Sequence, residues 1–165
     1  MPDLHFFQKI FLIQDMDARE LEQVLEIATP RTYPAGAVII QEGEAGNSLF
    51  IMRAGEVEIT KRLGLVLEGE APRERIIIGL KADEGVCFGE MALLENEPRS
   101  ATVTAATECH LWEIAREDLM ELIQKNRDLG CKILLRLAQL LSRHLRKTNQ
   151  DMVKLTTAMA ITLGR

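Results

Sequence analysis

The segment from residue 88 to residue 103 places one arginine and one carboxylate where they can recognise a phosphorylated sugar. Small residues, a turn and a short helical stretch present backbone N–H groups that suit an anion. Arg99 follows the turn, and its donor fork can form charge-assisted hydrogen bonds with that anion. A phosphate would repel Glu90, which is instead suited to accept a hydrogen bond from a ribose hydroxyl. The pair predicts a nucleotide site.

Structural roles are the alternative for Glu90 and Arg99, and they are the roles expected for the histidines and cysteines of the chain. Glu90 and Arg99 could also form a structural ion pair that braces the turn. Three histidines lack the spacing of metal ligands, so we expect them at the surface or in ordinary hydrogen bonds. Three cysteines without a CxxC pair predict reduced thiols rather than a disulfide or zinc site. These histidines and cysteines are His5, His110, His144, Cys87, Cys109 and Cys131. We therefore expect no catalytic site, no metal and no cofactor.

The elements that must position this segment are mainly short strands. Between residues 38 and 114, six segments rich in β-branched and apolar residues alternate with glycines. Strands of this length with glycine turns predict a sandwich or barrel, and we expect a jelly-roll-like β-roll. The predicted strands cover residues 38–40, 49–52, 57–60, 75–80, 101–105 and 110–114.

Helices are expected on both sides of the strands. Asp17 and Glu20 have capping-box spacing, which predicts a helix over residues 18 to 28 that ends before Pro30. Before it, Leu4, Phe7, Phe11 and Leu12 predict a shorter helix or turn packed by its apolar side. After the strands, helical periodicity predicts helices over 116–126 and from 128 to at least 156.

The long last helix carries an apolar stripe that predicts a homodimer. Its members step by four and three residues, as in a two-stranded coiled coil. They are Leu134, Ala138, Leu141, Leu145, Thr148, Met152, Leu155 and Met159. The alternative is that the stripe folds back on its own β-roll. Thr148 is the polar member, and its hydroxyl is expected either to bond its own helix or to reach a ligand.

The segment from 88 to 103 resembles the phosphate-binding cassette of cyclic nucleotide-binding domains. Phe88-Gly89-Glu90-x-Ala92-Leu93, followed by Pro98-Arg99-x-Ala101-Thr102-Val103, matches the family pattern without a gap. Gly36-x-x-Ile39-Ile40-x-Glu42-Gly43 is similar to its early strands, and the likeness extends from about Phe7 to Asn149. The family implies a β-roll of residues 1–126 with N-terminal helices and a cassette helix, and a lid and dimerisation helix over 127–165.

This resemblance also implies a role for each site residue. The amides of Gly89, Met91, Ala92 and Ala101 would hold the cyclic phosphate, and Arg99 would neutralise it. Glu90 would take the ribose 2′-hydroxyl, and Ser100 would bond phosphate or base. Thr148 would meet the adenine amine.

Composition restricts the class of function further. The chain has 165 residues and is 47% hydrophobic, which predicts one soluble domain. Its net charge of −5 would be repelled by the phosphates of a nucleic acid. No membrane span and no secretory signal are expected, so the cytoplasm is the predicted compartment. Only 16 residues follow Asn149, too few for a helix-turn-helix, so we expect no DNA binding by this chain alone.

The function predicted from these features is a regulatory sensor module in signal transduction. A cyclic nucleotide, with cAMP preferred, would bind in the β-roll and rearrange the C-terminal helix, which acts on a downstream protein that the sequence leaves unknown. Two alternatives stay open. One is a cGMP-binding module, and the other is the ligand-binding part of a longer transcription regulator.

Overall fold

The computed structural model describes residues 7, 9–62, 74–95 and 97–164. Within them eight strands form the centre of the fold: β1 (Ala28–Tyr33), β2 (Val38–Ile40), β3 (Ser48–Ala54), β4 (Glu56–Arg62), β5 (Glu74–Lys81), β6 (Cys87–Phe88), β7 (Thr102–Ala105) and β8 (Cys109–Ala115). The helices are α2 (Ala18–Glu26), the 3-10 helix η1 (Ala82–Glu84), α3 (Glu90–Glu95), α4 (Arg116–Lys125) and α5 (Arg127–Leu163).

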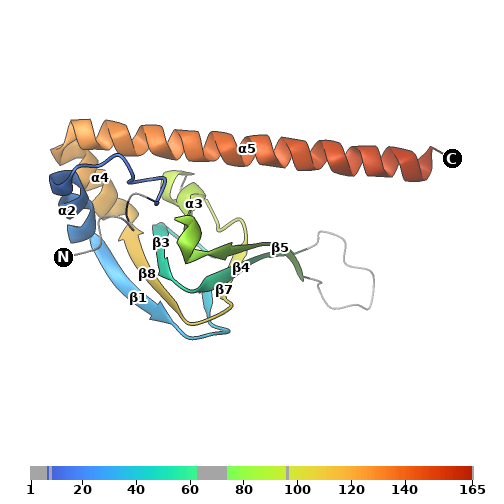
Figure 1. The fold of residues 1–165 in the computed structure, drawn as a ribbon, viewed down its shortest axis with the longest axis horizontal. Helices are drawn as coiled ribbons and strands as arrows, with labels where there is room; N and C mark the ends of the chain where they lie inside the picture. The colour runs from blue at the N-terminus through green and yellow to red at the C-terminus, as the bar shows by residue number, and fades with distance from the viewer. Residues whose placement is uncertain (1–6, 8, 63–73, 96, 165) are drawn as a thin grey trace.

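The strands form two antiparallel sheets of four strands each. Their orders are β1-β8-β3-β6 and β2-β7-β4-β5, so most neighbours in a sheet are distant in the sequence. Helices flank this β-roll at both ends of the chain (Figure 1). The predicted fold class, a mainly β structure with flanking helices and a long C-terminal helix, is confirmed.

One boundary differs from the prediction at the start of the β-roll. The capping box of Asp17 and Glu20 is present, but α2 ends at Glu26 and not at residue 28. Ala28 begins β1, which the sequence analysis did not predict because Pro30 lies inside it. Proline cannot donate to a strand ladder, but β1 is the edge strand of its sheet, where proline is tolerated.

Two groups of buried side chains form the core. One lies between the sheets, where the rings of Phe50 and Phe88 stack 5.4 Å apart. The other joins the N-terminal segment, α2, α4 and the start of α5 to the outer side of β3 and β8. Phe7 and Leu12 are buried there, as predicted for the N-terminal apolar segment, whereas Leu4 lies outside the described residues.

Helix α5 is 37 residues long, and its buried residues all lie in its first part. Its buried residues are Leu129, Gly130, Ile133 and Leu137. Beyond them the helix runs along one side of the β-roll, passes α3 and projects outward (Figure 1). At 1.5 Å per residue its length is about 55 Å.

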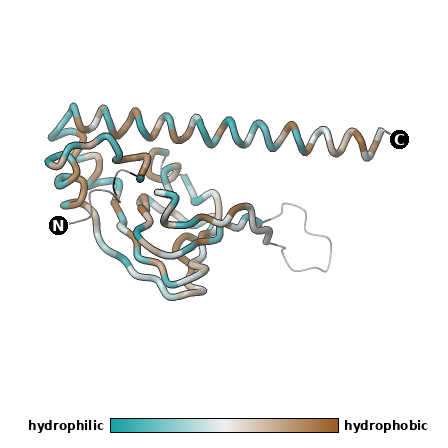
Figure 2. The backbone as a smooth tube through the Cα atoms, viewed as in Figure 1, coloured by the Kyte–Doolittle hydropathy of each residue, from teal (hydrophilic) through white to brown (hydrophobic). Residues whose placement is uncertain are grey.

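Most of the predicted apolar stripe faces solvent, although Leu141 is half-buried and Thr148 lines a pocket described below. Leu145, Met152 and Leu155 are 63%, 61% and 65% exposed, and Leu134, Ala138 and Met159 are exposed as well. Hydrophobic residues recur along α5 to its C-terminal end (Figure 2). The alternative in which the stripe as a whole folds back on its own β-roll is therefore wrong, because the buried residues of α5 belong to a different stripe.

Candidate functional site

A pocket of about 570 Å³ opens between the β-roll, the segment around α3 and helix α5. This volume suits a ligand of nucleotide size. All the residues that the sequence analysis assigned to the site line it: Gly89, Glu90, Met91, Ala92, Arg99, Ser100, Ala101 and Thr148. The structure thus brings α5 to the same site as the segment from 89 to 101.

Arg99 is a buried cation with uncharged hydrogen-bond partners. Its side chain is held at 2.9 Å by the backbone oxygen of Ser48 and at 3.3 Å by that of Gly89, both through Nη1. Nη2 donates to Oγ of Ser48 at 3.1 Å. Among the described residues, Arg99 forms no ion pair with a carboxylate.

The surroundings of Arg99 favour an anionic ligand. The residue is only 8% exposed. Burial lowers the pKa of its guanidinium because desolvation disfavours the charged form, an effect that the nearby carboxylates Glu113 and Glu90 partly offset. A charge that is buried without a partner of opposite sign is costly, and an anion in the pocket would remove that cost.

Two glycines allow the guanidinium to occupy this position. A Cβ atom at Gly46 would lie 2.7 Å from Cζ of Arg99, and one at Gly89 would lie 2.8 Å from Nη1. Gly89 also has a φ of 88°, a backbone conformation that residues with a Cβ atom rarely adopt. The placement of the Arg99 guanidinium therefore depends on glycine at both positions.

Glu90 begins α3 and is 6% exposed. Its Oε1 lies 3.2 Å from Nδ1 of His144 on α5, so the carboxylate pairs with the long helix and not with Arg99. The alternative of a structural ion pair between Glu90 and Arg99 is therefore wrong. The contact instead joins the segment around α3 directly to α5.

The backbone amides at the start of α3 need hydrogen-bond acceptors from outside the helix, as at every helix N-terminus. Leu93 N donates to the carbonyl of Gly89 at 3.3 Å, so Met91 and Ala92 belong to the first turn. The amides of a first turn have no acceptor within their own helix. They are available to oxygen atoms of a ligand.

The lining of the pocket also contains apolar side chains and one hydroxyl from α5. Apolar side chains here are Ile59, Ile78, Leu80, Val86 and Leu140. Thr148 Oγ1 donates to the carbonyl of His144 at 3.0 Å, so the predicted bond within its own helix is present. Thr148 lines the pocket as well, and its oxygen keeps the capacity to accept a hydrogen bond.

Sequence reasoning missed three residues of this arrangement. Ser48 and Gly46 lie in and before β3, far from the segment that contains Arg99, and neither has a chemical signature of its own. His144 was expected at the surface or in an ordinary hydrogen bond; it is half-exposed, yet its partner is Glu90. A signal for His144 existed in its place on the long helix, one turn before Thr148.

Comparison with known proteins agrees with this geometry. The cyclic nucleotide-binding domain model matches residues 30–126. The chain is 32% identical over 105 residues to a cGMP-dependent protein kinase of Drosophila melanogaster, covering 64% of this chain and 8% of the relative. It is 30% identical over 118 residues to the cAMP-dependent protein kinase regulatory subunit of Yarrowia lipolytica, covering 72% and 28%.

The solved structures agree as well. The Catabolite Activator Protein of Thermus thermophilus superposes with a TM-score of 0.74 at 29% identity, covering 88% of this chain and 63% of that one. The fold and pocket thus define a ligand-binding regulatory β-roll. The chain belongs to the cyclic nucleotide-binding domain family, and it spans less than a third of the length of the two kinase relatives.

The part of the chain that the structure describes contains no helix that is both long enough and apolar enough to cross a membrane.

Proposed function

We propose that this chain is a cAMP-responsive regulatory module. The observation that carries the proposal is Arg99, a buried guanidinium that lines the pocket and has only uncharged hydrogen-bond partners. A cyclic phosphate supplies the missing negative charge, and the amides at the start of α3 supply further donors. The family of the chain supports the same class of ligand.

Glu90 is proposed to accept the ribose 2′-hydroxyl. His144 contacts Oε1 of Glu90, which leaves Oε2 as the acceptor for a second donor. A neutral hydroxyl is the suitable donor here because a phosphate would be repelled by the carboxylate. Arg99 is therefore proposed to bind the phosphate of the ligand, and Glu90 its sugar.

The hydroxyl of Thr148 favours adenine over guanine. Its hydrogen is already donated to the carbonyl of His144, so the oxygen can act only as an acceptor. The exocyclic group of adenine donates at that edge, whereas the corresponding oxygen of guanine accepts. Ser100 can donate or accept and so serves either base. A cGMP-binding module remains the second candidate, since the kinase relatives include one named for each nucleotide.

Ligand binding is proposed to alter the packing of α5. Leu140, His144, Lys147 and Thr148 of α5 share the pocket with the β-roll, so a ligand there contacts both parts. It shifts the helix by as much as it favours one arrangement over another. The module itself is proposed to be non-catalytic and cytoplasmic, and to act on a downstream protein or domain. It could thus be part of a longer regulator.

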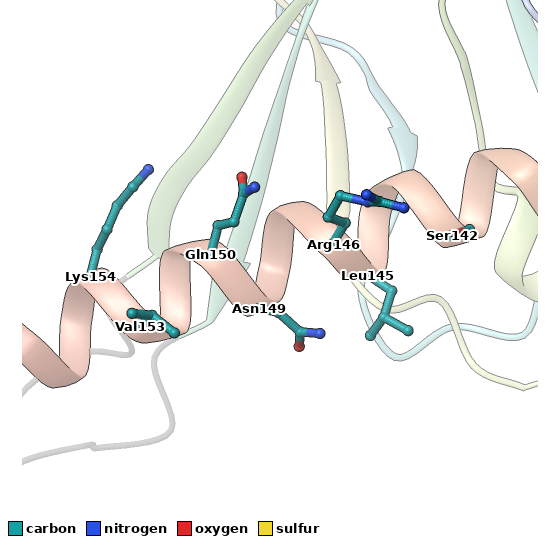
Figure 3. A pocket seen from close by; sticks show the side chains of 7 residues that line it. All are labelled: Ser142, Leu145, Arg146, Asn149, Gln150, Val153 and Lys154. Atoms are coloured by element: carbon teal, nitrogen blue, oxygen red, sulfur yellow. The ribbon is translucent and has the colours of Figure 1, made fainter.

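We further propose that α5 forms a homodimer through the exposed stripe. A second depression, shown in Figure 3, is formed by α5 side chains alone: Ser142, Leu145, Arg146, Asn149, Gln150, Val153 and Lys154. Leu145, Asn149 and Val153 point to one side of the helix, and Arg146, Gln150 and Lys154 point to the other (Figure 3). One helix cannot enclose a ligand. A second copy of α5 would cover the side that carries Leu145, Asn149 and Val153 together with the rest of the exposed stripe.

Calorimetric titration of the native chain with cAMP and with cGMP tests the proposed function. We expect cAMP to bind with micromolar or tighter affinity and more tightly than cGMP. Removal of the buried charge in Arg99→Ala should weaken binding by about 30-fold to several thousandfold, the range for one member of a buried charge pair. A loss of less than about threefold would place the phosphate elsewhere, and a tenfold preference for cGMP would reverse the choice of base.

A further inference from the structure

The contact between Glu90 and His144 joins the proposed ribose acceptor to an ionisable side chain of α5. Glu90 is buried, whereas His144 is half-exposed and can exchange protons with solvent. The two side chains meet at 3.2 Å, although they lie 54 residues apart in the sequence. Whatever changes the charge of His144 therefore acts directly on the carboxylate that is proposed to hold the ribose.

Other charged and titratable groups share the pocket with His144. Lys147 and Asp151 belong to α5, and Glu84 belongs to η1. Arg99 lines the same pocket, and Arg143 of α5 stacks over the ring of Phe11 at 3.9 Å. Cys87 stays neutral near physiological pH because burial raises its pKa to about 12.

The pairing favours the protonated form of His144. Its hydrogen bond with Glu90 raises the pKa of His144 above the ordinary value of 6.5, while partial burial and the charge of Lys147 work in the opposite direction. Histidine in such a place changes charge within the physiological range.

Building on the proposed function, we propose that His144 positions Glu90 for the ribose and couples nucleotide binding to the uptake of a proton. Protonated His144 neutralises Glu90 and fixes one of its oxygens, so the other is presented to the 2′-hydroxyl. Neutral His144 leaves the negative charge of Glu90 uncompensated in a pocket that must also accept an anionic phosphate. An arginine or lysine at this position would provide the same charge without the dependence on pH.

The direction of the pH effect follows from this arrangement. The ligand adds a negative charge near His144, so binding favours the protonated imidazole and proton uptake accompanies it. By linkage, affinity must then fall as the pH rises through the pKa of His144. Each pKa unit by which the ligand raises the pKa of His144 corresponds to about a tenfold difference in affinity between the pH at which the imidazole is protonated in both states and the pH at which it is neutral in both.

Calorimetric titrations with cAMP at several pH values, in buffers of different ionisation enthalpy, test the proposal on the full chain. The native protein should bind more weakly at the high-pH end, by about tenfold for each unit by which the ligand raises the pKa of His144, and should take up protons on binding. His144→Gln should remove the slope and the proton uptake, and His144→Arg should bind tightly at every pH. His110→Gln, an imidazole on β8 that contacts Thr32, should keep the native slope.

A second measurement needs no ligand. In the free protein, the NMR titration of His144 should move to lower pH in Glu90→Gln, because the variant loses the negative partner. A native affinity that is constant with pH, or a slope that persists in His144→Gln, would overturn the proposal while leaving nucleotide binding intact. Absence of cAMP and cGMP binding at every pH would overturn the proposed function together with it.

Discussion

The carbonyl oxygen of Ser48 accepts a 2.9 Å hydrogen bond from Nη1 of Arg99, although 51 residues separate the two. Ser48 begins β3, a strand with neighbours on both sides in its sheet, so the guanidinium is attached to the interior of that sheet and not to an edge. The hydroxyl of the same serine holds Nη2. Arg99 is thus oriented before any ligand arrives, which lowers the ordering cost of binding.

Gly46→Ala should impair nucleotide binding without unfolding the chain. The new methyl group would meet the guanidinium, and the flexible end of Arg99 can move away from its place. We expect cAMP affinity to fall by at least about tenfold, because a displaced guanidinium loses part of its charge-assisted bonding. Titration calorimetry and thermal unfolding measure the two effects. Gly79→Ala, where a Cβ would meet nothing within 4 Å, should bind as the native protein does. Native affinity in Gly46→Ala would refute the placement of the ligand at Arg99.

The ribose contact can be isolated with a modified ligand. If Glu90 accepts from the 2′-hydroxyl, 2′-deoxy-cAMP should bind the native protein more weakly than cAMP does. It should lose little further affinity in Glu90→Gln, because two groups that contact each other do not contribute additively. Binding constants for both ligands and both proteins complete the cycle. Fully additive losses would place Glu90 away from the sugar.

Thr148→Val should reduce the preference for adenine. The substitution keeps the shape of the side chain and removes its acceptor, so cAMP affinity should fall by about 2- to 12-fold, the value of one hydrogen bond. Affinity for cGMP should change little. Thr156→Val is the matched control, because Thr156 Oγ1 also donates to the carbonyl four residues earlier but lies beyond the pocket. Competition between the two nucleotides measures the ratio, and an unchanged ratio in Thr148→Val would contradict the assignment.

The exposed stripe of α5 makes the homodimer testable without damage to the core. Leu145→Glu combined with Met152→Glu places like charges along the proposed seam and should yield a folded monomer. Sedimentation velocity at about 100 μM would detect a dimer with a dissociation constant near 10 μM. Leu135→Glu combined with Ile161→Glu changes exposed residues off the stripe and should leave the dimer unchanged. A native protein that sediments as a monomer would contradict the interface.

Much of the fold and of the candidate site was predictable because it rests on local patterns. Glycine turns between short apolar runs predicted six of the strands within one or two residues of their ends. The residues from Phe88 to Val103 are contiguous, so Glu90 and Arg99 could be assigned to one site before their positions were known. Whether these residues bind a nucleotide stays a prediction.

The remainder depends on contacts that spacing does not reveal. His144 meets Glu90 because α5 passes α3, beyond the buried residues that hold the first part of α5 on the domain, the last of which is Leu137, about two turns earlier. Ser48 reaches Arg99 because the segment just before β3 pairs with Arg99: the amide of Gly43 donates to the Arg99 carbonyl at 2.9 Å, and the amide of Arg99 donates to the Glu44 carbonyl at 2.9 Å. β1 was missed because a proline weakens the strand signal, while its tolerance at a sheet edge is a property of the assembled sheet.

The position of β8 between β1 and β3 has a consequence for synthesis of the chain. β3 is almost wholly apolar along Leu49–Met52, and its partner β8 ends 61 residues after β3 does. At about 5 to 20 residues per second, a ribosome needs about 3 to 12 s to add them. During that interval a hydrophobic strand has an open edge. The nascent chain is therefore most prone to aggregation before the last strand emerges, and faster synthesis of residues 55–115 would shorten that exposure.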